Sequence, residues 1–179
     1  MKKVLYIFVV LITVISINAC KENPSEASLK EQILALEDSV FTDNMEVKQF
    51  QDENVVILSE KYQAYAETEG TPDSSAVDAL FKAVALAKNV NRSYAKAIQL
   101  LNKIHTDYPE SPRASTALFY EGFTYANDLQ DYDKAKKVYD KFLKKYPNDP
   151  MAASVMAEIQ NLGKTPDQII EEFQKKNKK

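Results

Sequence analysis

The chain has 179 residues, of which 23 are basic and 26 acidic, with one histidine, one cysteine and no tryptophan. This acidic balance is not that of a nucleic-acid-binding protein, which presents an excess of Lys and Arg. A lone cysteine excludes an intrachain disulfide, and one histidine with one cysteine leaves few side chains from which to build a zinc site or a catalytic triad. We therefore expect a protein that is not an enzyme and has no cofactor and no metal.

Residues 1–19 are predicted to be an export signal. Lys2 and Lys3 supply the positive start, and residues 4–17 form an apolar run that is too short to cross a bilayer, for which roughly 20 residues are needed. The following "INAC" resembles the lipobox of bacterial lipoproteins. That resemblance implies removal of 1–19 and acylation of Cys20. The alternatives are an ordinary signal peptide with a chance cysteine, or an uncleaved anchor.

Acylation of Cys20 would place the protein in the cell envelope with the membrane as one partner. Each buried CH₂ contributes about 0.8 kcal/mol, so two or three acyl chains hold a domain without a spanning helix. Lys21 is not the aspartate that signals inner-membrane retention, which favours the outer membrane; the periplasmic face and the cell surface both stay open. Residues 20–28 are polar and contain a proline, so we interpret them as the lipidated cysteine and a tether.

Residues 29–50 are predicted to contain an N-terminal amphipathic helix. Leu29, Ile33, Leu36 and Val40 follow one another at helical spacing. This stripe is shorter than the three or four heptads of a coiled coil, so packing against the next helix is favoured over self-association. A second helix is expected over about 52–68, ended by Gly70 and Pro72.

The chain from residue 76 onward is predicted to be a regular series of helices, because apolar residues recur every three or four positions and no segment alternates with a period of two. The expected helices cover roughly 76–90, 93–108, 112–128, 131–146, 150–162 and 166–175. The fold class is therefore all-α.

The segments "HTDYPESPRA" (105–114) and "KKYPNDPMAA" (144–153) share the same pattern of a Tyr-Pro pair followed by a second proline. A residue before proline avoids the helical region, so Tyr108 and Tyr146 should end their helices. Ser111 and Asp149 should then be N-caps, with Pro112 and Pro150 at the first helical positions. A period of about 38 residues with two helices per unit is typical of a helical solenoid.

Residues 117–150 resemble the tetratricopeptide repeat. The matching positions are Leu118, Gly122, Tyr125, Ala135, Tyr139 and Pro147. Departures are Glu121, where an aliphatic residue is usual, and one extra residue in "NDLQDY". A weaker copy covers 78–112, and 52–68 resembles the second half of a degenerate earlier copy. The resemblance implies that 51–164 form a short right-handed solenoid of tetratricopeptide-type helix pairs.

Residues 165–179 are predicted to form a C-terminal capping helix and a basic tail. Gly163 suits a helix C-terminus, and Thr165 with Gln168 suits a capping box. Ile169, Ile170 and Phe173 share one side, which we expect to cover the open end of the last repeat.

The repeat register predicts a concave wall that binds a protein or peptide. The candidate residues are Phe81, Lys88, Asn89, Phe119, Phe123 and Asn127. Phenylalanines beside amides suit an extended peptide or an amphipathic helix, although the rings could instead pack on the preceding helix. His105 is expected to be a surface or half-buried residue without a functional role.

These features together favour a lipid-anchored envelope scaffold that binds a protein partner. The arrangement is similar to the lipoprotein of the β-barrel assembly machinery and to the cell-division coordinator of the Tol-Pal system, which implies outer-membrane protein assembly or envelope and division coordination. The alternative is a surface lipoprotein that takes part in glycan or nutrient capture, although the chain has no tryptophan on which a sugar could stack.

Overall fold

The computed structural model describes residues 25–42, 46–48, 53–68, 70–90 and 92–177, so the expected signal and Cys20 lie outside the described residues. The described chain is all-α apart from an isolated bridge between Phe41 and Val47. Its helices are α1 (Glu26–Val40), α2 (Glu53–Ala66), α3 (Asp73–Ala85), α4 (Tyr94–Asp107), α5 (Ala114–Phe123), α6 (Tyr132–Lys145), α7 (Ala152–Asn161) and α8 (Pro166–Asn177), with π-helical turns η1 (Leu86–Val90) and η2 (Thr124–Asp128).

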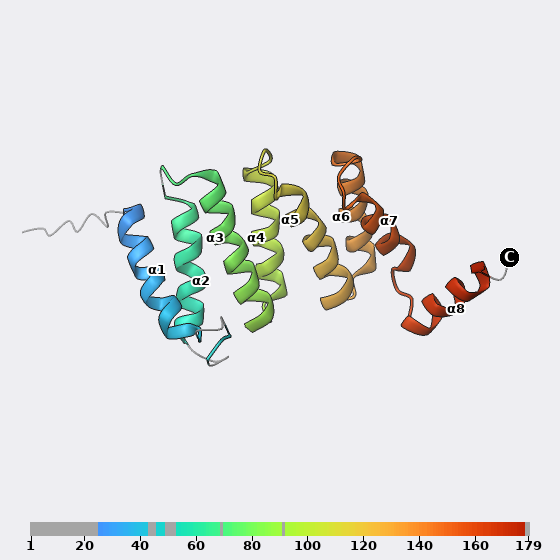
Figure 1. Ribbon diagram of the computed structural model, residues 1–179, viewed down its shortest axis with the longest axis horizontal. Coiled ribbons are helices and arrows are strands. Elements are labelled where there is room, and N and C mark those ends of the chain that lie inside the picture. Colours follow the sequence, from blue (N-terminus) through green and yellow to red (C-terminus); the bar gives the residue numbers. More distant parts are fainter. Residues whose placement is uncertain (1–24, 43–45, 49–52, 69, 91, 178–179) are drawn as a thin grey trace, which may run out of the picture.

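The helices α1 to α7 pack in chain order, each against the next, to form the predicted helical-repeat solenoid (Figure 1). Two groups of buried side chains fill it. The first group runs through α1 to α4 and ends at Ala117 on α5, and the second joins α5, η2, α6 and α7 around Tyr139 and Phe142. Because each helix contacts mainly its neighbours in sequence, the array is held together by local interfaces.

The period of the sequence is reproduced in the backbone. Helix α6 begins and ends one period after α4, at the same offset that separates Tyr146 from Tyr108, and η2 follows η1 at that offset as well. Both π-helical turns lead into a residue with positive φ, Arg92 at 48° and Gln130 at 53°. The turn that reverses the chain within a helix pair is therefore the same structure in both copies.

The turns between helix pairs differ from the prediction by two residues. Helices α5 and α7 begin at Ala114 and Ala152, so Pro112 and Pro150 lie in the turn and not at the first helical position. The Ser111 hydroxyl instead accepts a hydrogen bond from the backbone N–H of residue 113 (3.2 Å), and the Asp149 carboxylate accepts one from that of residue 151 (2.8 Å). Short polar side chains stabilise such local turns as readily as helix N-termini.

The N-terminal helix fills only the first part of the predicted segment 29–50 and begins three residues before it, at Glu26. Helix α1 ends at Val40, where the backbone becomes extended. Hydrogen bonds from Thr42 N–H to Glu46 C=O (2.8 Å) and from Lys48 N–H to Val40 C=O (2.9 Å) turn the chain back. The predicted apolar stripe does pack on the neighbouring helix α2, with Leu29, Ile33 and Val40 buried.

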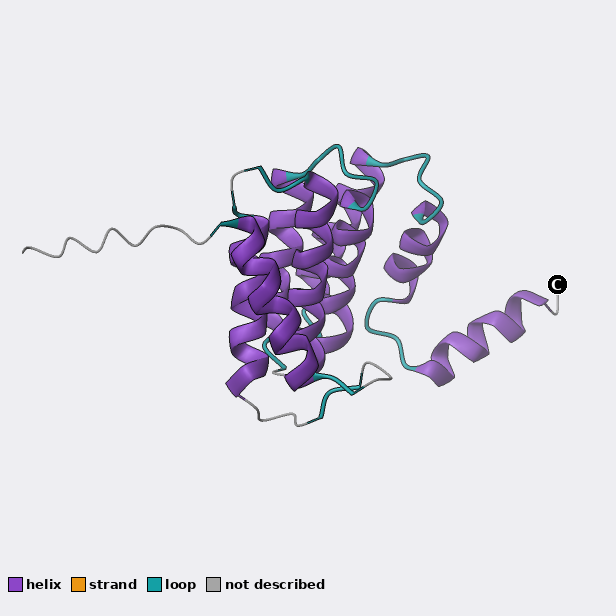
Figure 2. Ribbon diagram, turned by 60° about the vertical axis from the view of Figure 1, so that its left-hand side comes forward, coloured by secondary structure: helices purple, strands orange, loops and turns teal. Residues whose placement is uncertain are grey.

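The last helix does not cap the array as predicted. Its start is as expected, since Gly163 has φ +73° and Thr165 and Gln168 exchange the two hydrogen bonds of a capping box. Its apolar side, however, faces outward: Ile170 is 54% exposed and Phe173 66% exposed. Helix α8 projects from the end of the solenoid (Figures 1 and 2). The sequence specified the helix and its stripe, but not the surface that the stripe would contact.

Candidate functional site

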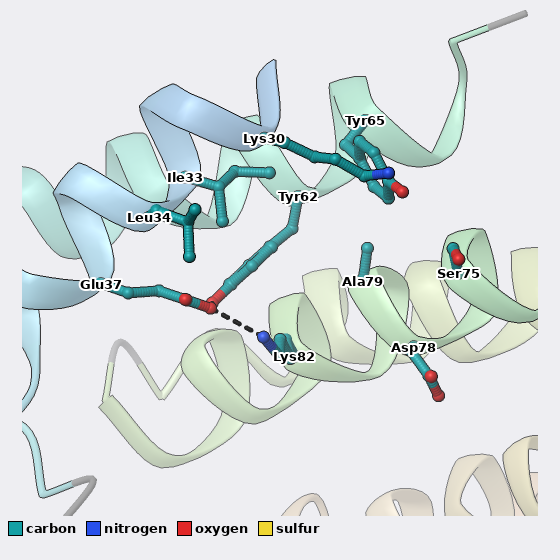
Figure 3. Close-up of a pocket in the computed structure, with 10 residues that line it drawn as sticks. All are labelled: Lys30, Ile33, Leu34, Glu37, Tyr62, Tyr65, Ser75, Asp78, Ala79 and Lys82. Atoms are coloured by element: carbon teal, nitrogen blue, oxygen red, sulfur yellow. Dashed lines mark hydrogen bonds and ion pairs between the residues drawn. The ribbon is translucent and has the colours of Figure 1, made fainter. Parts of the chain in front are cut away.

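A groove between α1 and α3 has a volume of about 380 Å³. Helix α2 forms its floor through Tyr62 and Tyr65, whose rings are set in the core by the helical spacing of α2. Leu34 on α1 stands at the rim and is 62% exposed. The lining residues are Lys30, Ile33, Leu34, Glu37, Tyr62, Tyr65, Ser75, Asp78, Ala79 and Lys82 (Figure 3).

An ion pair joins the two walls of the groove. The Lys82 ammonium lies 2.7 Å from Glu37 Oε1 and 5.2 Å from the centre of the Tyr62 ring, and the Tyr62 hydroxyl donates to the same carboxylate oxygen (Figure 3). Burial alone would raise the pKa of Glu37, but the hydrogen bonds from Lys82 and Tyr62 outweigh it and lower that pKa. Burial and the adjacent carboxylate raise the pKa of Tyr62. The Glu37 carboxylate therefore stays ionised and paired with Lys82 across the groove.

A second cavity of about 280 Å³ continues the groove beyond this ion pair. Tyr62 and Lys82 line both cavities, so the ion pair divides one long depression along the exposed face of α3. Asn89, one of the predicted wall residues, lines the second cavity together with Phe41 and Val47.

Side chains of α3 and η1 contact side chains of the following helix pair near the predicted wall. The Arg113 guanidinium lies 3.8 Å from the centre of the Phe81 ring and pairs with Asp78. The Lys88 ammonium lies 2.7 Å from Asp128 and 5.0 Å from the centre of the Phe123 ring. The structure thus brings Lys88 and Phe123 together, as the register implied.

Phe119 and Phe123 combine the two predicted alternatives. Both are half-buried, with ring centres 6.0 Å apart, and Phe119 also lies 6.1 Å from the buried ring of Tyr139. Phe119 therefore packs against the second core group, whereas Phe123 contacts the Phe119 ring and Lys88. Asn127 is exposed and lines a separate polar pocket of about 140 Å³ with Gln130 and Tyr132, at the end of η2.

The two segments 78–111 and 116–149 match the family model of the tetratricopeptide repeat. These two segments are similar to tetratricopeptide repeats. The matched segments coincide with the helix pairs α3–α4 and α5–α6, and the pair α1–α2 packs ahead of them with the same antiparallel layout. No curated protein and no solved structure matches the chain.

The repeat pattern is broken at Glu121, and the structure explains the departure. His105 on α4 is 1% exposed, contrary to the prediction of a surface or half-buried position, and its Nε2 lies 2.7 Å from the Glu121 carboxylate on α5. A buried carboxylate needs a hydrogen-bonding partner. The lone histidine therefore joins the two tetratricopeptide repeats.

Two further findings concern other functional classes. Within the described ranges no cluster of three His, Cys, Asp or Glu side chains could hold a metal ion. None of the helices in that same part of the chain is both long enough and apolar enough to traverse a bilayer.

The sequence did not reveal the groove between α1 and α3, because its walls come from helices that lie far apart in the chain. Leu34 lies off the apolar stripe of α1, and this out-of-stripe leucine was the available signal for a second apolar face. The Glu37–Lys82 pair could be predicted only once α1 was recognised as the first helix of a repeat-like pair.

Proposed function

We propose that the chain is a lipid-anchored scaffold of the cell envelope that binds a protein partner along the exposed face of α1, α3 and α5. The tetratricopeptide repeats support a protein-interaction scaffold. The observation that carries the proposal is the open, largely apolar groove between α1 and α3; the half-buried aromatic rings of α5 are a second apolar surface on the solenoid.

The groove suits the apolar side chains of an amphipathic helix or an extended peptide. Ile33, Leu34 and Ala79 provide an apolar surface at its walls, and the tyrosine floor is held rigidly by the core. Rigid aromatic surfaces bind with little loss of conformational freedom. Because Glu37 and Lys82 are already paired with each other, the partner need not bring a compensating charge into the groove.

The anchor would place this groove close to a membrane. Helix α1 begins at Glu26, only a short tether away from Cys20. A tether of this length spans at most about 20 Å when fully extended. A partner bound between α1 and α3 would then lie near the outer membrane, as expected in outer-membrane protein assembly or in envelope and division coordination.

Glycan or nutrient capture is the second candidate, favoured by the polar pocket at the end of η2. Asn127, Gln130, Asn161 and Glu158 line it beside the 41% exposed ring of Tyr132, and burial raises the pKa of Glu158. Amides beside an aromatic ring are suited to a sugar. Binding on a glycan array that is lost in Asn127→Ala, with no change in protein capture, would favour this candidate.

Partner capture tests the scaffold proposal. Leu34→Glu should abolish recovery of the partner from crosslinked envelopes, and Phe119→Ser or Phe123→Ser should weaken it, because each change removes apolar contact area from the binding face. The matched control is Val56→Glu on α2, which also replaces an exposed apolar residue by an acid but lies outside the groove. Mass spectrometry of the crosslinked products gives the readout.

The opposite pattern would place the binding face elsewhere. If Lys137→Glu and Lys141→Glu on the outer surface of α6 abolish capture while the groove variants retain it, the partner binds the basic face. Leu34→Glu should keep the helical circular-dichroism spectrum of the wild type, since Leu34 is mostly solvent-exposed.

The anchor has its own test. Cys20→Ala should leave a folded protein that no longer fractionates with the outer membrane, because the acyl chains that hold it there cannot be attached. Cell fractionation followed by immunoblotting measures the distribution. A variant that still sediments with the outer membrane as the wild type does would exclude acylation of Cys20 as the anchor.

A further inference from the structure

Helix α8 presents an apolar stripe to solvent. Ile170 and Phe173 are 54% and 66% exposed, Ile169 is half-buried, and none of the α8 side chains that the structure describes is buried. Two large apolar side chains one helical turn apart form a contact surface of the kind that binds another helix.

Helix α7 lacks one of the neighbours that the earlier helices have. Helix α3 packs between α2 and α4, and α5 packs between α4 and α6, whereas α7 packs mainly on α6. Met156 on α7 is consequently 48% exposed, and Ile159 and Leu162 are only half-buried. The position that a following helix would occupy is open.

The segment that follows α7 does not return the chain to this open position. Helix α7 matches α5 in length and lies one period after it, but α5 continues into the turn η2 before the chain reverses. In place of that turn stands "LGKTP" (162–166), and α8 starts directly at Pro166. The reversal that returns α6 onto α5 is therefore missing after α7.

Local contacts hold α8 in its outward direction. The backbone N–H of Lys164 donates to Asn161 C=O (3.0 Å), and the Lys164 ammonium pairs with Glu172 on α8 at 2.7 Å. The Tyr132 ring lies against Gly163, whose positive φ turns the chain away. Together with the Thr165 capping box, these contacts fix the start of α8 relative to α7.

We propose that two copies of this chain exchange their α8 helices. The stripe of Ile169, Ile170 and Phe173 in one copy packs on the open side of α7 in the other, against Met156. The neighbouring outer surface of α6 carries the exposed Lys137, Lys141 and Lys144, and α8 carries Asp167 and Glu171. The acidic residues of α8 are opposite in charge to these lysines, which favours this pairing, and Glu171 also lies 3.6 Å from Lys175 on its own helix. Reciprocal exchange closes a two-fold dimer and leaves no open end.

Site-specific crosslinking tests the exchange in the full-length chain purified in detergent. One batch carries Cys20→Ala with Met156→Cys, and a second carries Cys20→Ala with Phe173→Cys. After mixing and treatment with a short bismaleimide, we expect a covalent dimer that contains one chain of each kind. The matched control replaces Gln174, the exposed residue next to Phe173, by cysteine, and it should give several-fold less dimer.

A chain that carries both cysteines separates the remaining outcomes. A crosslinked monomer as the main product would mean that α8 folds back onto its own α7, which overturns the proposal. In another outcome none of the pairs crosslinks, and light scattering finds the wild type and a chain ending at Lys164 in the same oligomeric state. That result would show that α8 is a free arm and would also overturn the proposal.

The contact itself is tested by Ile170→Asp with Phe173→Asp. This double variant and the chain ending at Lys164 should both be monomeric under conditions in which the wild type is a dimer. Neither change should alter the monomer's helical fold, because no described side chain of α8 is buried in it. A dimer that persists in the double variant would overturn the proposal.

Discussion

Gly122→Leu is expected to prevent the second half of the solenoid from packing, and Gly122→Ala alone should lower the free energy of unfolding by about 1–3 kcal/mol, the usual cost of overpacking. A Cβ atom at Gly122 would lie 2.5 and 2.6 Å from two carbons of the Tyr139 ring. Tyr139 is fully buried between α5 and α6, so its ring has no free space into which it could move.

Chemical denaturation of Gly122→Ala gives the free energy directly, and a reduced helical signal with bound hydrophobic dye reports the failure of Gly122→Leu to pack. The control Ala95→Leu enlarges an exposed residue of α4 and should stay within about 0.5 kcal/mol of the wild type. Combining Gly122→Ala with Tyr139→Leu should recover part of the loss, since the smaller side chain makes room. A wild-type midpoint for Gly122→Leu would mean that α5 and α6 pack in another register.

The glycine and tyrosine were predictable from the sequence because both belong to a pattern repeated along one chain. Small and large side chains at fixed positions of a repeat specify how closely its two helices approach. The same holds for the helix ends: the capping box of Thr165 and Gln168 depends on a short local stretch of sequence and was predicted correctly.

Features that join distant segments could not be predicted in this way. The surface that the apolar stripe of α8 contacts depends on whether the chain reverses direction after α7. The short turn between α7 and α8 sets this direction. The groove requires Glu37 and Lys82 to meet from helices 45 positions apart. The role of His105 was missed because its close partner, Glu121, lies on the next helix and not on its own.

Of the two partners in that buried pair, His105 is expected to be the more costly to remove. His105→Leu leaves the Glu121 carboxylate inside the interface between the repeats without its 2.7 Å contact, and breaking a buried pair in this way typically costs about 3–5 kcal/mol. Glu121→Leu leaves the imidazole of His105 without this partner instead, and an unsatisfied buried polar group of this kind should cost about 1–3 kcal/mol.

The double variant His105→Leu with Glu121→Leu should return to within about 1 kcal/mol of the wild type, because an apolar pair of similar volume replaces the buried polar one without leaving an unpaired group. Leucine at residue 121 is also the type of aliphatic residue that is usual at this position of the repeat. Urea denaturation of the four proteins gives the coupling energy between the two sites. The exposed Lys136–Asp140 pair on α6 is the control, and its coupling should be only about 0.3–0.5 kcal/mol. If instead the losses of the two single variants simply add in the double variant, His105 and Glu121 do not form a pair, and the two repeats are held together by apolar packing alone.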